Sequence, residues 1–261
     1  MVHTGVLRAL TGVWIWGAVL RRELLCIPHA VFRFMDAFPD QLVSWWPSAR
    51  REVECMAAAV PLMVARLGAP LADTVFATDA MGASELDSGG FGIVGRKVDS
   101  GVVAECYRRG VAPGHTVIKL DDDFSGLRHP EREIARCAPF TNLPAELFRS
   151  SEGRPWPIID KGRWLYADHI TLGESRTVVR LAHLLAREPG ARNRKIISLQ
   201  DNRPTAGCMM KGRSPAPALN YLCRRRAGTT LAARLQLLLP WTESKLMPAD
   251  EASRDLGGHW A

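Results

Sequence analysis

The run KIISLQDN occupies residues 195–202 and begins with a continuous apolar stretch, Lys195–Leu199. Such a stretch is typical of a strand that is buried on both faces, as in a sheet covered by helices. Gln200, Asp201 and Asn202 follow it, and the ligands of open α/β sheets gather beyond the carboxyl ends of the strands. The run therefore predicts an α/β protein in which Asp201 stands at the ligand-binding edge of the sheet.

Three β-rich runs precede this strand, at Thr74–Thr78, Phe91–Val94 and Val102–Tyr107. Consecutive strands joined by short turns predict an antiparallel meander. Residues 110–165 show no sustained periodicity and contain several prolines, so we expect an irregular insertion there, with one short helix at 130–137.

Beyond the insertion, the pattern predicts the order helix, strand, helix, helix, strand, helix. The expected helices are Leu172–Ala186, Pro204–Met210, Ala216–Leu235 and one that starts at Pro248, and the last strand is Gln236–Trp241. The sum is an α/β fold with a mixed five-stranded sheet flanked by helices.

Residues 1–70 are expected to be helical and to serve as a scaffold, because they contain no constellation of reactive side chains. An amphipathic helix is predicted from Ser48 to about Leu67. The apolar stretch Val6–Leu20 is about fifteen residues long and carries Arg8, whereas a bilayer core needs about 20 apolar residues. We therefore expect no membrane-spanning segment.

The composition, with 47% hydrophobic and 23% charged residues, is that of a globular protein and excludes a disordered tail, collagen and a coiled coil. Six cysteines without a CxxC or paired spacing indicate reduced thiols in an intracellular protein of the cytoplasm or nucleus. The net charge is +7, and residues 175–234 carry 13 Lys and Arg against only Glu188 and Asp201. This excess favours a polyanionic partner, although a solvated basic face would show the same pattern.

Four carboxylates stand at strand ends or helix starts. Asp79 closes the first strand and Asp201 the fourth, while Glu174 and Asp250 lie in the first turns of two helices. If the two strands are adjacent and parallel, all four acids can converge, and such a cluster would raise its own pKa values or recruit divalent cations. Oxygen ligands suit Mg²⁺ or Mn²⁺. Each acid alone also has a structural explanation, as a turn residue, a helix cap, a helix-dipole partner or an exposed side chain.

The order of elements resembles that of ribonuclease H (RNase H), and local strings resemble the RNase H region of retroelement polyproteins of the tyrosine-recombinase (DIRS-like) type. The strings are Thr78-Asp79-Ala80, His169–Arg176, Leu199–Asn202 with Lys211–Ser214, and Trp241–Ser244 followed by Pro248–Arg254. The resemblance covers residues 71–256, with 110–165 as an insertion, and leaves 257–261 as a tail. More weakly, residues 1–70 resemble the segment that joins the polymerase thumb to RNase H.

This resemblance implies an RNase H-like fold and an endonuclease that hydrolyses the RNA strand of RNA–DNA hybrids as part of a reverse transcriptase, with the polymerase portion of a larger polyprotein as a partner. It implies that Asp79, Glu174, Asp201 and Asp250 bind two Mg²⁺ or Mn²⁺ ions. The residues expected to hold the nucleic-acid backbone are Arg176, Asn202, Lys211, Arg213, Arg224, Arg225 and Arg226.

Other functions remain open at this point. The chain could be a catalytically decayed retroelement fragment that acts at most as a non-specific nucleic-acid-binding module, or a purely structural connection module. A DEDD-type 3′–5′ exonuclease usually carries Asp-x-Glu on its first strand, and Met81 at the third position argues against that class.

Overall fold

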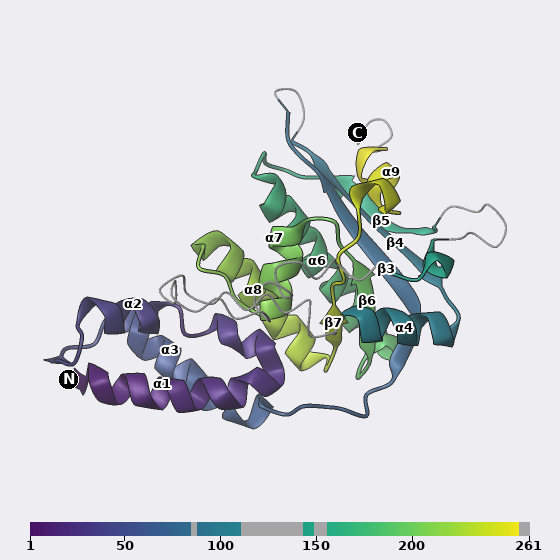
Figure 1. Ribbon diagram of the computed structural model, residues 1–261. Coiled ribbons are helices and arrows are strands. Elements are labelled where there is room, and N and C mark those ends of the chain that lie inside the picture. The colour runs from purple at the N-terminus through teal and green to yellow at the C-terminus, as the bar shows by residue number, and fades with distance from the viewer. Residues whose placement is uncertain (85–87, 111–142, 149–155, 256–261) are drawn as a thin grey trace, which may run out of the picture.

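The computed structural model describes residues 1–84, 88–110, 143–148 and 156–255. Two parts lie side by side, a helical segment of residues 1–70 and an α/β body from residue 71 onward (Figure 1). In the helical segment the helices are α1 (Thr4–Ala18), the 3-10 helix η1 (Val19–Cys26), α2 (Ala30–Ala37), α3 (Pro47–Ala59) and the 3-10 helix η2 (Val60–Leu62). A pair of two-residue strands, β1 (Val2–His3) and β2 (Leu42–Val43), completes it. The helix expected to reach Leu67 thus ends earlier, where Pro61 interrupts the chain.

The α/β body is built on one mixed five-stranded sheet. Its strands are β3 (Leu71–Met81), β4 (Gly90–Lys97), β5 (Ile158–Arg163), β6 (Lys195–Leu199) and β7 (Gln236–Leu238), in the spatial order β5-β4-β3-β6-β7. The first three pair antiparallel, and β6 and β7 run parallel to β3. The expected α/β class with a mixed five-stranded sheet is therefore confirmed for the described residues.

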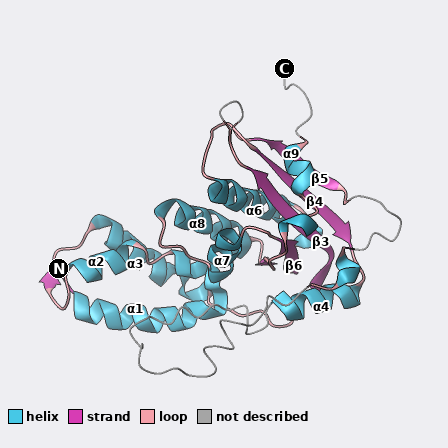
Figure 2. Cartoon of the chain, turned by 45° about the horizontal axis from the view of Figure 1, so that its top comes forward, coloured by secondary structure: helices cyan, strands magenta, loops and turns pink. Residues whose placement is uncertain are grey.

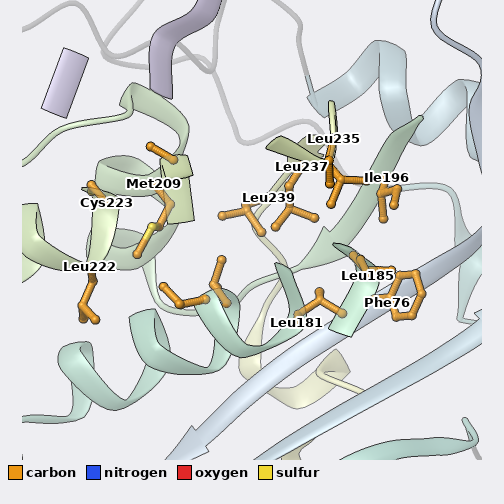
Figure 3. Close-up of a cluster of buried hydrophobic side chains, with 14 of the residues drawn as sticks. Phe76, Leu181, Leu185, Ile196, Met209, Leu222, Cys223, Leu235, Leu237 and Leu239 are labelled. Carbon is orange, nitrogen blue, oxygen red and sulfur yellow. The ribbon is translucent and has the colours of Figure 1, made fainter. Parts of the chain in front are cut away.

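Helices cover both faces of this sheet (Figure 2). They are α4 (Ser100–Gly110), α6 (Ile170–Arg187), α7 (Arg203–Lys211), α8 (Pro217–Ala232) and α9 (Asp250–Arg254). One core lies between the sheet and α6, α7 and α8, and it includes Phe76, Leu181, Ile196 and Leu222 (Figure 3). The opposite core packs β3, β4 and β6 against α4 and α9. Because successive strand residues face opposite sides, Phe76 enters the first core and its neighbours Val75 and Ala77 enter the second.

The third strand is not where the sequence pattern predicted it. The run Val102–Tyr107 lies in helix α4, which buries Val103 and Cys106 at helical spacing. The third strand is instead β5, inside the expected irregular insertion. The insertion prediction for 110–165 is therefore wrong at β5 and at the short 3-10 helix Ala145–Leu147, whose Leu147 is fully buried. The helix expected at 130–137 and the tail 257–261 lie outside the described residues.

The helical segment packs against α8 and the end of α7, mainly through η1. Gly212, which follows α7 with φ +75°, packs so closely against the backbone of Arg22 that a Cβ there would lie 1.9 Å from the Arg22 oxygen. Asn220 on α8 donates a hydrogen bond to the carbonyl of Cys26 (3.0 Å). Among the described helices, none is both long and apolar enough to cross a bilayer.

Candidate metal centre

Strand register places Asp79 and Asp201 side by side. Strands β3 and β6 are adjacent and parallel, and Ala77 pairs with Leu199. Asp79 lies two residues after Ala77, and Asp201 lies two residues after Leu199. Both carboxylates therefore stand at the carboxyl edge of the sheet. The indole of Trp241 donates a hydrogen bond to the carbonyl of Asp201 (2.7 Å) and so fixes the segment just beyond β6.

Glu174 reaches the same edge from α6, one residue beyond the first turn in which it was expected. Its side chain is buried, and Gln200 Nε2 donates a hydrogen bond to Glu174 Oε2 (2.7 Å). Gln200 Oε1 in turn accepts a hydrogen bond from Thr78 Oγ1 (3.0 Å). Both the nitrogen and the oxygen of the buried Gln200 amide therefore form hydrogen bonds. The bond to the Glu174 carboxylate holds it toward the end of β3.

Helix α9 brings Asp250 to the site by packing directly on β4. Gly92 faces Asp79 across the β3–β4 pair, and a Cβ at Gly92 would lie 2.6 Å from the backbone nitrogen of Ser253. The absent side chain lets α9 approach, so that Ser253 Oγ donates a hydrogen bond to Asp79 Oδ2 (2.5 Å). Asp250 forms an ion pair with Arg254 (2.7 Å).

Three of the four predicted acids form one tight group. Asp79, Glu174 and Asp201 each offer a carboxylate oxygen, and these oxygens all lie within 4.8 Å of one another. Asp250 is outside this group but lines the same cavity of about 410 Å³, together with Asn202 and Arg254. The structure therefore brings all four acids to one cavity and three of them within reach of a single ion.

Burial and mutual repulsion raise the pKa values of the two most buried acids. For Asp79, desolvation raises the pKa to about 6, and the charges of Asp201 and Asp250 act in the same direction while the Ser253 hydrogen bond opposes them. For Glu174, desolvation is again the largest cause, followed by the charges of Asp79 and Asp201, and the pKa rises to about 9. A bound cation would oppose both shifts, because it stabilises the ionised carboxylates.

The donor set suits a hard divalent cation. All three grouped ligands are carboxylate oxygens, which Mg²⁺ and Mn²⁺ prefer, and no thiol or imidazole belongs to the group. Like charges this close are costly unless protons or cations compensate them. The residues present therefore fit Mg²⁺ or Mn²⁺, with Asp79, Glu174 and Asp201 as ligands and Asp250 at the margin.

Comparison with known proteins adds no assignment to this site. No protein family, curated protein or solved structure matches the chain.

The predicted nucleic-acid contacts are spread over the molecule. Asn202 lines the acidic cavity and caps α7, where its Oδ1 accepts a hydrogen bond from the Thr205 nitrogen (2.9 Å). Arg176 is partly exposed and forms an ion pair with Asp168. Lys211 and Arg213 are exposed, but they lie at the far end of α7 from the cavity.

The three consecutive arginines on α8 do not form one basic surface, because consecutive helix residues point about 100° apart. Arg224 is engaged by the helical segment, where it contacts Glu52 and two backbone carbonyls. Arg226 is only 3% exposed. The expectation of a three-arginine phosphate surface is therefore corrected to Arg225, whose side chain is exposed beside Tyr221.

Two side chains that hold the acids in place were not predicted from the sequence. Gln200 orients Glu174, and Ser253 binds Asp79. Gln200 directly precedes Asp201, so the sequence placed it at the end of the strand. A polar residue at that position, however, predicts an exposed side chain rather than a completely buried one. Ser253 is three residues from Asp250 and so on the same helix face, which is the one signal that could have indicated it.

Proposed function

We propose that the chain is a two-metal nuclease of the RNase H type that hydrolyses the RNA strand of RNA–DNA hybrids. The observation that carries this proposal is the group of three carboxylates at the carboxyl edge of β3 and β6, with oxygens within 4.8 Å of one another. The order of elements from β3 to α9 and the mixed sheet support an RNase H-like fold, and so does the position of Asp250 on the last helix.

The side chains divide into ligands and groups that position them. Asp79, Glu174 and Asp201 would hold the cations, with Asp250 contributing from α9. When bound, divalent cations supply Lewis-acid stabilisation of phosphate oxygens and activation of water. Gln200 and Ser253 restrict the rotation of Glu174 and Asp79, so the negative charges are already oriented before a substrate arrives.

Substrate binding would depend on charge rather than on base sequence. Asn202 is the predicted contact nearest to the acids, and Arg176 lies two residues after Glu174 on α6. Contacts of this kind bind phosphate and sugar groups and fix the register of the duplex without reading bases. The 2′-hydroxyl of the RNA strand is the group that would distinguish a hybrid from DNA.

The test is cleavage of a labelled RNA–DNA hybrid by the wild type and by Asp201→Asn, in Mg²⁺, in Mn²⁺ and in EDTA. Asp201→Asn keeps the shape of the side chain and removes one negative ligand, so we expect cleavage to fall by more than about a hundredfold while the melting temperature stays equal or rises. Glu251→Gln is the matched control, since Glu251 is the exposed neighbour of Asp250 and does not line the cavity.

Equal cleavage by the wild type and Asp201→Asn would overturn the role of Asp201. Metal-independent hybrid binding by a wild type that never cleaves would favour the alternative, a decayed fragment that acts as a non-specific nucleic-acid-binding module. Cleavage of duplex DNA at the same rate as the hybrid would refute the assignment of the substrate.

A further inference from the structure

A second cavity lies between the helical segment and the α/β body, at the opposite end of the parallel strands from the acids. Its volume is about 270 Å³. The wall combines η1 and the chain before β3 with the amino ends of β6 and β7 and with residues from α7 and α8. Because Lys195 begins β6 and Asp201 follows its end, the two cavities are roughly 20 Å apart along this strand.

The lining of this cavity is strongly basic. Its charged residues are Arg21, Arg22, Arg66, Lys195 and Arg226, against the single acid Glu23. Lys195 donates a hydrogen bond to the carbonyl of Leu67 (2.8 Å), and Arg66 donates one to Asn193, so these two side chains are fixed at its wall.

Two of the arginines are buried with unused donors. Arg226 is 3% exposed and Arg21 is 5% exposed, and the Nε atom of each has no hydrogen-bond partner. Arg21 forms a long ion pair with Glu23, whose Oε1 lies 3.6 Å from Arg21 Nη2, too far for a hydrogen bond. Among the described residues, no carboxylate forms an ion pair with Arg226.

Local backbone geometry directs Arg21 inward. The 3-10 helix η1 is interrupted at this residue, which has φ −138° and ψ 79°. This kink takes Arg21 out of the helical path, and its side chain becomes buried while that of its neighbour Arg22 stays exposed.

A guanidinium group stays protonated in a protein, so burial cannot be compensated by loss of its proton. Burial of a guanidinium charge is costly where it lacks a close counter-ion, which is the case for Arg226, and Arg21 has only the distant Glu23. An anion in the cavity that accepts from these guanidinium groups would reduce this cost. Phosphate oxygens match the planar fork of arginine and can accept from two guanidinium groups together.

We propose that this cavity binds a small phosphate-bearing anion, a phosphate or diphosphate group, which links the two parts of the molecule. Arg21 and Arg66 come from the helical segment, and Arg226 and Lys195 come from the α/β body. The volume is just below the range of about 300–1,000 Å³ typical of pockets for drug-sized ligands, so it suits a compact anion rather than a nucleic-acid duplex.

The test uses the full chain in EDTA, with inorganic phosphate as the probe and sodium chloride to match ionic strength. Calorimetric titration and the melting temperature are measured for the wild type, Arg226→Met and Arg51→Met. We expect phosphate to raise the melting temperature of the wild type and of Arg51→Met, and to bind Arg226→Met at least about tenfold more weakly. Arg51→Met is the matched control, because Arg51 on α3 is exposed and outside the cavity.

Arg21→Met provides the same test from the helical segment should Arg226→Met fail to fold, and we expect the same loss of affinity. No binding to the wild type at about 10 mM phosphate would overturn the proposal, as would equal affinities of the wild type and the Arg21 or Arg226 variants. A single-stranded oligonucleotide distinguishes the source of the phosphate: if it requires Arg226 while free phosphate does not bind, the cavity contacts a nucleic-acid backbone instead of a small anion.

Discussion

Glu174 illustrates how one residue couples stability to the proposed metal site. The carboxyl group is buried and faces two other acids, and its pKa is raised from 4.5 to about 9. Between these values the unfolded chain has lost this proton while the folded protein still holds it. The unfolded state then binds fewer protons, so the free energy of unfolding falls as the pH rises through this window.

We expect Glu174→Gln to abolish this dependence, since an amide of the same shape carries no titrating proton and can still accept the hydrogen bond of Gln200. In EDTA, the melting temperature of the wild type should fall relative to that of Glu174→Gln between about pH 5 and pH 9. Mg²⁺ should restore the wild type most at high pH, because a cation binds the ionised carboxylates and displaces the proton. Parallel melting curves for both proteins across this range would contradict the buried, protonated state of Glu174.

The positions of the four acids could be predicted from the sequence, because each acid stands next to the end of a predicted strand or the start of a predicted helix. Asp79 and Asp201 meet because β3 and β6 are adjacent and parallel, which was the condition for the acids to converge. The side chains that hydrogen-bond to these acids could not be predicted in the same way. The complete burial of Gln200 and the contact of Ser253 with Asp79 depend on how α6 and α9 pack on the sheet, and no local pattern encodes that packing.

At the scale of elements, α4 and β5 show where a pattern of residue types fails. The run Val102–Tyr107 has strand-like composition, but short apolar runs do not distinguish strand from helix. Strand β5 has the opposite problem: only Ile158 and Ile159 are apolar, and both are exposed. This strand lies at the edge of the sheet and is held there by backbone pairing with β4. Backbone pairing places few requirements on side-chain type, so the sequence shows no clear strand pattern.

The packing of α9 on β4 requires a glycine at position 92, because any side chain there would meet the α9 backbone. In Gly92→Ala the new Cβ would meet backbone atoms of Ala249, Ala252 and Ser253 at 2.6–2.9 Å, and backbone cannot rotate away as a side chain can. We expect a loss of about 1–3 kcal/mol in the free energy of unfolding, with lower hybrid cleavage as α9 moves Asp250 and Ser253 from Asp79. Urea unfolding and the cleavage assay measure the two effects.

Gly228→Ala is the control for Gly92→Ala. Gly228 lies within α8, and a Cβ there would meet nothing within 4 Å. Alanine should therefore stabilise the protein by about 0.4–1 kcal/mol without changing cleavage. Equal stabilities of Gly92→Ala and the wild type would show that α9 tolerates displacement from β4.

The whole molecule depends on contacts between the helical segment and the α/β body that the sequence pattern did not indicate. Glu52 on α3 is buried, and its Oε2 accepts a hydrogen bond from the Val31 nitrogen (2.9 Å). Arg224 on α8 donates to Glu52 Oε1 (2.5 Å) and to the carbonyls of Cys26 and Ile27. An arginine counted in the basic surplus of residues 175–234 thus holds the two parts of the chain together.

We expect Arg224→Met to lower the free energy of unfolding by about 2 kcal/mol. Removing one partner of a buried ion pair costs about 3–5 kcal/mol, and the partial exposure of Arg224 reduces this value. A double-mutant cycle with Glu52→Gln should give a coupling energy of about 1 kcal/mol or more. The exposed pair Arg50–Glu54 on the same helix α3 is the matched control, where about 0.5 kcal/mol or less is expected. If the two cycles gave the same coupling energy, the Arg224–Glu52 pair would behave as an exposed surface pair and would not hold the helical segment to the α/β body.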